Sequence, residues 1–264
     1  MPALFVCHGG GPFPLMPEPV GGPGLTEHLK AISKQPAETP KAILMVSAHW
    51  EESAELAVTA SEHPDLLFDY YGFPDEYYKL KYPAPGDPEL AKRVQSLLAS
   101  AGHPTRLDKQ RGFDHGVFVP LLLAYPEAEI PVICLSLDAS LDPKTHLSIG
   151  KALSPLRDEG VLIVASGVSF HNMRAFDMSG RASGPPAGAA WDRALTDAVT
   201  GDQAGRHAAL AQWTTLPEAR YCHPREEHLL PLMVAAGTAL ETEIATRNYA
   251  ESYLGAAMSG FRFG

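Results

Sequence analysis

The chain has 264 residues, and its 21 lysines and arginines are outnumbered by 31 aspartates and glutamates, which gives a formal net charge of −10. Hydrophobic residues make up 45% and charged residues 20% of the chain, which is typical of a folded globular protein and excludes a disordered or fibrous one. Since the balance is acidic and no run of basic residues occurs, we expect no nucleic acid partner.

The cysteines and apolar segments indicate the cellular compartment. The three cysteines are far apart and form no C-x-x-C pair, so they predict neither a disulfide framework nor a thiolate zinc site. No segment approaches the roughly 20 apolar residues of a membrane span, and prolines interrupt the start of the chain. We therefore expect a cytoplasmic protein that is not processed and has no membrane partner.

In chain order, short apolar runs alternate with amphipathic segments, and Gly and Pro separate them. The predicted strands are residues 3–7, 42–47, 56–60, 132–136 and 161–165. The predicted helices are residues 25–34, 89–100, 117–125, 144–157 and 225–240. Two strand-like pieces follow, residues 243–249 and 258–263. This alternation predicts an α/β fold, in which residues 1–264 form a single domain with a central, mostly parallel sheet, flanking helices and C-terminal edge strands.

Two segments have the composition of loops. Residues 61–88 are rich in both aromatics and prolines, and long ordered loops of this kind are often functional. The aromatic residues within 68–82 could line the pocket for a substrate ring, but aromatic residues in a packed loop more often serve the core. Residues 180–190 combine small residues with paired prolines, which predicts a surface loop that acts as a lid or as a linker.

Three histidines follow predicted strands. His8 and His49 come directly after apolar runs, and His171 comes a few residues after another. In an open α/β sheet, ligands bind beyond the carboxyl ends of the strands, so these side chains are expected to converge on one cleft. Each histidine alone is more simply explained as a partly buried residue of the fold, and it is their shared position that predicts a site.

Two further histidines belong to the same pattern. His115 lies in the turn Gly112-Phe113-Asp114-His115-Gly116 at the start of a predicted helix, where a capping role is the simpler explanation. His228 precedes the apolar run Leu229-Leu230-Pro231-Leu232 in the predicted helix 225–240. Neutral imidazole is a common ligand of iron and zinc, so His8, His49 and His228 could form an open metal site, with His171 and His115 left for acid–base chemistry.

A hydrolase is a competing interpretation. His8-Gly9-Gly10-Gly11 matches the oxyanion-hole motif of lipases and esterases. The segment nearest to a nucleophile elbow, Gly167-Val168-Ser169-Phe170-His171, lacks the second glycine, so we discount that enzyme class. The triple glycine also fails the dinucleotide-binding pattern, because Pro14 stands where its last glycine should be.

Taken together, the histidine motifs resemble those of the class III extradiol ring-cleavage dioxygenases of the catalytic B-subunit type, most closely the single-chain DOPA 4,5-dioxygenase branch. The resemblance rests on Cys7-His8-Gly9-Gly10-Gly11-Pro12, Ser47-Ala48-His49-Trp50, Gly112-Phe113-Asp114-His115-Gly116, Ser166-Gly167 with His171-Asn172-Met173, and Glu227-His228-Leu229-Leu230-Pro231-Leu232. Tyr82-Pro83-Ala84-Pro85-Gly86 is also similar to that branch.

The resemblance implies a non-haem Fe(II) enzyme that cleaves a small catecholic substrate with O2 to a semialdehyde product. It implies that His8, His49 and His228 are metal ligands, that His171 is the acid–base residue, and that His115 donates a hydrogen bond to bound oxygen or substrate. Zn(II) could replace Fe(II) in purified protein, because zinc binds imidazole more tightly than ferrous iron does. A monomer or a small homo-oligomer is expected.

Several alternatives stay open at this stage. The related branch usually has His-Gly-Ser-Pro, so the loop after His8 is one residue longer here, and an inactive metal-binding relative is one possibility. A zinc-dependent hydrolase on the same three histidines is another. Other members of the family use a glutamate as the third ligand, so Glu227 or Glu226 could replace His228. Arg111 and Arg174 adjoin the motifs of His115 and His171 and are candidates to bind a substrate carboxylate or are ordinary surface arginines.

Overall fold

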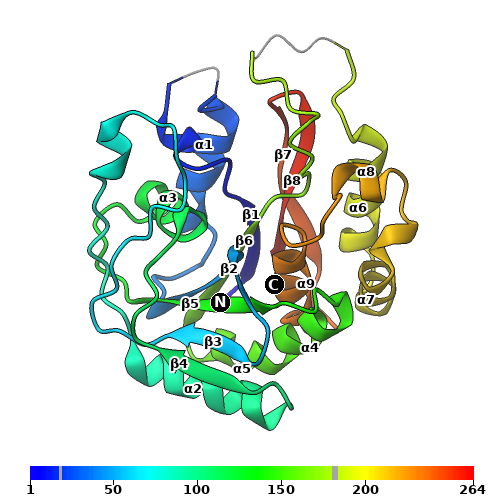
Figure 1. Cartoon of the computed structure of the whole chain (residues 1–264). Coiled ribbons are helices and arrows are strands. Elements are labelled where there is room, and N and C mark those ends of the chain that lie inside the picture. Colours follow the sequence, from blue (N-terminus) through cyan, green and yellow to red (C-terminus); the bar gives the residue numbers. More distant parts are fainter. Residues whose placement is uncertain (18–19, 180–183) are drawn as a thin grey trace.

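A single mixed sheet organises the chain. The computed structural model describes residues 1–17, 20–179 and 184–264, and its eight strands are ordered β4-β3-β5-β2-β6-β1-β8-β7 (Figure 1). The strands are β1 (Ala3–Cys7), β2 (Ala42–Glu52), β3 (Leu56–Thr59), β4 (Thr105–Asp108), β5 (Val132–Asp138), β6 (Val161–Gly167), β7 (Ala245–Tyr253) and β8 (Ala256–Phe263). The predicted α/β fold with a mostly parallel sheet is confirmed.

The centre of the sheet is parallel and buried on both faces. β2 pairs in parallel with β5 and β6, and β6 pairs in parallel with β1. Every residue of β1 and β6 is buried. This burial explains why the sequences of these strands are continuous apolar runs and do not alternate between apolar and polar residues, since helices cover both faces of a parallel sheet. All four strands consequently direct their carboxyl ends to the same edge.

Helices cover the two faces of the sheet. The longer ones are α1 (Pro23–Lys30), α2 (Pro88–Ser100), α3 (His115–Ala124), α4 (Pro143–Leu153), α6 (Ala189–Thr200), α7 (Gln203–Ala211) and α9 (Leu230–Gly237). Short turns are η1 (Phe13–Leu15), η2 (Ala31–Lys34), η3 (Asp75–Tyr78), α5 (Pro155–Asp158), η4 (Trp213–Thr215) and α8 (Ala219–Cys222). α1 and α3 contact each other on one side of the central strands, and α4, α7 and α9 contact one another on the other side (Figure 1).

The C-terminal strands extend the sheet as an antiparallel hairpin, which confirms the predicted edge strands. β8 pairs antiparallel with β1, and β7 pairs with β8. Leu254 and Gly255 make the turn with φ values of 48° and 78°. Turns with two positive φ values have the twist that suits a two-residue hairpin connection.

Three predicted helices differ from the structure. The helix expected over residues 25–34 divides into α1, which ends at Lys30, and the short turn η2. The helix expected over residues 144–157 divides into α4 and α5, because Pro155 has no N–H to continue the backbone hydrogen bonds. The helix expected over residues 225–240 is shorter, since α9 begins only at Leu230, with Pro231 in its first turn. His228 therefore lies in the turn that precedes α9 rather than within a helix. β4, α6 and α7 were not predicted.

The two predicted loops have different outcomes. Residues 61–88 form a long irregular segment around η3, and Phe68, Phe73, Tyr77 and Tyr78 pack against the core. Of the loop predicted over residues 180–190, residues 180–183 lie outside the described residues, and 189 already belongs to α6. Within the described part of the chain, every helix is too short or too polar to cross a bilayer.

Candidate functional site

All five candidate histidines lie at the carboxyl edge of the central strands. His8 follows β1, His49 lies near the end of β2, and His115 is the first residue of α3. His171 follows β6, and His228 precedes α9. The ring centroids of His49 lie 4.9 Å from His8, 4.0 Å from His115 and 4.8 Å from His228. The ring of His171 stacks on that of His228 at 3.5 Å. Residues up to 220 positions apart are thus brought into one cluster by the parallel sheet.

β2 is longer than predicted and carries His49 into this cluster. The predicted strand ended at residue 47, but β2 continues to Glu52. Its register against β5 shifts between Val46 and Glu51. Such an irregularity bends a strand and changes the direction of its side chains, and it falls on the stretch that contains His49.

The hydrogen bonds of His8 determine which of its ring nitrogens carries the proton. Nδ1 lies 2.9 Å from the Ser166 hydroxyl, which donates its own proton to the carbonyl oxygen of Gly116. Nδ1 must therefore be the donor to Ser166, and Nε2 keeps its lone pair. That Nε2 lies 3.0 Å from Nε2 of His49. Burial, followed by the neighbouring His49, holds the pKa of His8 well below its ordinary value, so the ring is neutral at pH 7.

Asp69, a residue that the sequence did not single out, supports His115. Its Oδ1 accepts hydrogen bonds from Nδ1 of His115 at 2.8 Å and from the His115 backbone N–H at 3.0 Å. Its other oxygen lies 3.9 Å from Nδ1 of His49. Burial opposes the charged carboxylate, but the hydrogen bonds from His115 outweigh burial and lower the pKa of Asp69. Asp69 belongs to the aromatic loop 61–88, which therefore contributes a polar group to the site.

Glu227 supports His228 and His171 in the same way. Its Oε1 lies 2.8 Å from Nδ1 of His228 and 3.1 Å from Nδ1 of His171. Burial raises the pKa of this carboxyl, but the hydrogen bonds from His171 and His228 outweigh it, so the pKa lies well below its usual value. The neighbouring Glu226 instead pairs with Arg220. Of the two glutamates weighed as a third ligand, Glu227 thus contacts the histidine cluster and Glu226 is engaged elsewhere.

The possible ligand atoms form two adjoining groups. In one, ring nitrogens of His8, His49 and His115 lie within 4.8 Å of one another. In the other, ring nitrogens of His171 and His228 and a carboxylate oxygen of Glu227 lie within the same distance. His228 also approaches the first group, since its ring centroid is 5.4 Å from that of His8. Both His115 and His228 are therefore placed near His8 and His49.

A cavity of about 190 Å³ adjoins the histidines. His49, His115, His171 and His228 form the polar part of its wall, together with the backbone of Gly9, Gly10 and Gly11. The rest of the lining is largely apolar and consists of Val168, Met173, Phe176, Tyr253, Leu254 and Met258. The cavity therefore combines imidazole groups with a surface suited to an aromatic ring.

The two arginines considered for a substrate carboxylate are not among the described lining residues. The Arg111 guanidinium bonds to the His49 carbonyl and to Asp114, and it stacks over Trp50. Arg174 is exposed. Neither arginine is placed for the role of a carboxylate clamp.

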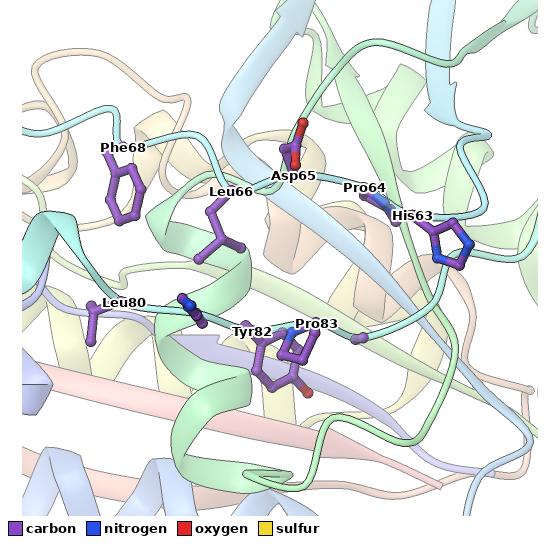
Figure 2. Close-up of a pocket in the computed structure, with 10 residues that line it drawn as sticks. His63, Pro64, Asp65, Leu66, Phe68, Leu80, Tyr82 and Pro83 are labelled. Carbon is purple, nitrogen blue, oxygen red and sulfur yellow. The ribbon is translucent and has the colours of Figure 1, made fainter.

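A second hollow lies beside the aromatic loop and contains none of the five site histidines. Figure 2 shows two stretches of this loop along it, residues 63–68 and 80–84, with Leu66, Phe68 and Tyr82 among the labelled side chains. The described lining of the histidine cavity, by contrast, includes no residue of the aromatic loop 61–88. Its rings pack on the core while Asp69 contacts His115.

The structure also excludes Ser169 as the nucleophile of a hydrolase. Ser169 is fully buried, and its hydroxyl oxygen accepts a hydrogen bond from the backbone N–H of Ser259 at 2.8 Å. A catalytic serine must be accessible to substrate and bonded to a base. Ser169 consequently has a structural role.

Comparisons with known proteins identify the family of this chain. The family model described as the catalytic LigB subunit of aromatic ring-opening dioxygenase matches residues 18–262. A 4,5-DOPA dioxygenase extradiol of Beta vulgaris is 44% identical over 211 residues, which cover 79% of this chain and 77% of that protein. One of Escherichia coli (strain K12) is 37% identical over 242 residues, covering 90% of this chain and 84% of that protein.

Two further similarities extend over the whole chain. The dioxygenase tasH of Hapsidospora irregularis is 39% identical over 285 residues, covering 100% of this chain and 85% of that protein. The crystal structure of an uncharacterized protein from Escherichia coli K12 matches with a TM-score of 0.79 and 31% identity over 100% of both chains. The chain therefore belongs to the LigB family of aromatic ring-opening dioxygenases, and it is an extradiol ring-cleaving enzyme of the single-chain, DOPA dioxygenase-like type.

Proposed function

We propose that this dioxygenase uses Fe(II), held by His8, His49 and His228, to cleave a small catechol with O2 to a semialdehyde. The observation that carries the proposal is the convergence of these three imidazoles beside the cavity. The catecholic substrate is supported by the names of the relatives, which are 4,5-DOPA dioxygenases.

The chemistry of the donor set fits a divalent transition metal. Burial lowers the pKa of His8 and His49 well below the ordinary value, and it lowers the pKa of His228 to about 4. All three rings are then neutral at pH 7 and offer lone pairs, which ferrous iron and zinc both accept. Ferrous iron would bind the catechol oxygens and transfer electrons between substrate and O2, which zinc cannot do because it has no redox chemistry.

His171 and His115 are proposed as the acid–base and hydrogen-bonding groups. Both line the cavity. Since Nδ1 of His171 faces Glu227, its Nε2 is the atom free to take a proton from a catechol hydroxyl and to return it later. The carboxylate of Asp69 beside His115 would compensate a protonated ring, which could donate a hydrogen bond from Nε2 to oxygen or substrate.

The remaining features of the proposal concern the whole chain. His8 precedes the matched family segment and His228 lies within it, so we propose that residues 1–264 act as one catalytic domain. Its proposed location is the cytoplasm, as a monomer or small homo-oligomer.

The function is tested by anaerobic loading of the protein with Fe(II) or Zn(II), followed by measurement of O2 uptake with a panel of catechols. We expect O2 consumption and a yellow semialdehyde product with Fe(II) only. Full iron loading without O2 uptake on any catechol would contradict the dioxygenase. Activity on an ester or amide with Zn(II) would instead support the hydrolase.

The ligand set is tested by iron content after loading. His228→Ala is expected to reduce bound iron by at least about 10-fold, whereas His171→Ala and His115→Ala are expected to keep the metal and lose turnover. Full iron retention in His228→Ala together with iron loss in His115→Ala would make His115 the third ligand.

A further inference from the structure

Glu227 contacts two histidines to which we give different roles. One of its oxygens, Oε1, lies within 2.8 Å of Nδ1 of His228 and within 3.1 Å of Nδ1 of His171. We propose that Glu227 is a positioning residue that keeps both rings in the Nδ1–H form, so that Nε2 of His228 is free for the metal and Nε2 of His171 is free for the substrate. This inference rests on the roles given to the two histidines under the proposed function.

The chemistry of the groups leaves one arrangement of protons. An ionised carboxylate can only accept hydrogen bonds, so each Nδ1 that contacts Oε1 must be the donor. A neutral imidazole has a single N–H, and Nε2 of each ring is then a bare acceptor. The Glu227 carboxylate thereby leaves Nε2 of His228 able to bind a metal and Nε2 of His171 able to accept a proton.

The geometry of the two rings shows that they are oriented as a unit. Their centroids are 3.5 Å apart and their planes differ by 22°, so they are stacked nearly parallel. Since both Nδ1 atoms lie within 3.1 Å of one oxygen, Nε2 of each ring is the nitrogen more distant from that oxygen. Both residues line the cavity. A displacement of Glu227 would consequently disturb the two rings together.

Glu227 is itself held between two parts of the fold. Its Oε2 is in ion-pair contact with Arg225 at 3.3 Å. Arg225 also makes two 2.6 Å hydrogen bonds to the carboxylate of Glu51, which lies on β2 two residues after His49. The series Glu51–Arg225–Glu227 thus connects the strand that carries His49 with the turn that carries His228.

The adjacent Glu226 provides a matched control. It is a carboxylate in the same turn, but it pairs with Arg220. Glu226→Gln therefore changes the charge of this turn by the same amount as Glu227→Gln without touching either imidazole. A difference between the two variants reports the contacts of Glu227 and not the net charge.

The test compares Glu227→Gln, Glu227→Leu and Glu226→Gln. Three quantities are measured: iron bound after Fe(II) loading, kcat and KM for a catechol, and the histidine tautomers in ¹H–¹⁵N spectra of the protein before and after Zn(II) loading, since bound metal by itself would fix the proton of His228 on Nδ1. In the wild type we expect Nδ1–H signals for both histidines.

The variants should differ in a defined way. Gln keeps an acceptor oxygen but adds an N–H₂ group, so Glu227→Gln should keep the metal within about 3-fold and lose about 10-fold in kcat with little change in KM. Glu227→Leu should lose about 10- to 100-fold in metal affinity and, before metal loading, both Nδ1–H signals, and Glu226→Gln should match the wild type.

Distinct results would overturn the inference. Wild-type tautomers with Nε2–H on either ring contradict it without reference to activity, and this result does not require any variant to fold. Unchanged kcat and iron content in Glu227→Leu contradict it as well. Equal iron loss in both Glu227 variants with unchanged histidine tautomers would identify Glu227 as a ligand. If the wild type binds iron but cleaves no catechol, the proposed function fails, whereas the spectra still decide the role of Glu227.

Discussion

Gly167, the last residue of β6, joins the backbone segments of two proposed metal ligands. Its carbonyl accepts a hydrogen bond from the backbone N–H of His8 at 3.0 Å. A Cβ atom at this position would lie 2.2 Å from the carbonyl oxygen of His228, closer than real atoms approach. That same oxygen accepts a hydrogen bond from the N–H of Val168. Only glycine at position 167 allows the backbone of the turn before α9 to pack directly against the end of β6.

At this position we predict that Gly167→Ala displaces the turn that carries His228. The expected result is a loss of about 1–3 kcal/mol in the free energy of unfolding, because the contact is with backbone that cannot rotate away. Iron affinity should fall by about 10-fold in the same variant. Urea unfolding and metal content measure the two effects. Gly201→Ala is the control, since an added Cβ there meets no atom closer than 3.5 Å, and wild-type iron binding in Gly167→Ala would refute the displacement.

Among the elements, the packing of α9 against α4 determines the position of the turn that carries His228. Every residue of α9 is buried, so its sequence is apolar on all sides and its position depends on its neighbours. The two helices approach each other closely at Gly150 of α4, where a Cβ atom would lie 2.1 Å from the carbonyl oxygen of Val234. α9 begins at Leu230, two residues after His228, so a movement of this helix moves the proposed ligand.

We expect Gly150→Ala to separate α4 from α9. The overpacked contact should lower the free energy of unfolding by about 3 kcal/mol and reduce bound iron. Lys151→Ala on the exposed side of the same helix should change the free energy of unfolding by less than about 0.5 kcal/mol. Denaturant titration of both variants tests this expectation, and equal stabilities would show that the helix contact is not tight.

For the molecule as a whole, buried neutral histidines link stability to pH. Burial lowers the pKa of His28 to about 4, and its ring stacks on Tyr249 at 4.5 Å. Burial likewise lowers the pKa of His223 to about 3. In the unfolded chain both return to about 6.5, so below pH 6.5 the unfolded state binds more protons than the folded state does. Stability must therefore decrease as the pH falls from 6.5 towards 4.

The predicted decrease is about 2 kcal/mol for His28 between pH 7 and pH 5, at about 1.4 kcal/mol per pH unit below 6.5. Replacing His28 by Phe keeps a ring against Tyr249 and removes the titrating group. Urea unfolding at pH 7 and pH 5 should show a smaller pH dependence in His28→Phe than in the wild type. The same pH dependence in both proteins would exclude His28 as a source of the effect.

Much of the fold and part of the site can be predicted from local sequence. The central strands are recognisable because both of their faces are buried, and His8 and His49 are recognisable because they stand at or near strand ends. The supporting groups carry no such local signal. Asp69 is 46 residues from His115, and Ser166 is 158 residues from His8, so only the folded chain relates them.

The sequence by itself determined an α/β sheet and predicted that His8, His49 and His171 stand at its carboxyl edge, because strand burial and the common direction of parallel strands follow from local apolar runs. Tertiary structure alone decided that His228 lies in a turn, that Glu227 contacts two rings, and that Asp69 reaches the site from the aromatic loop. Those contacts depend on which distant segments of the chain meet in the folded protein. Helix packing and close backbone contacts determine where the segments meet, and neither leaves a periodic pattern in the sequence.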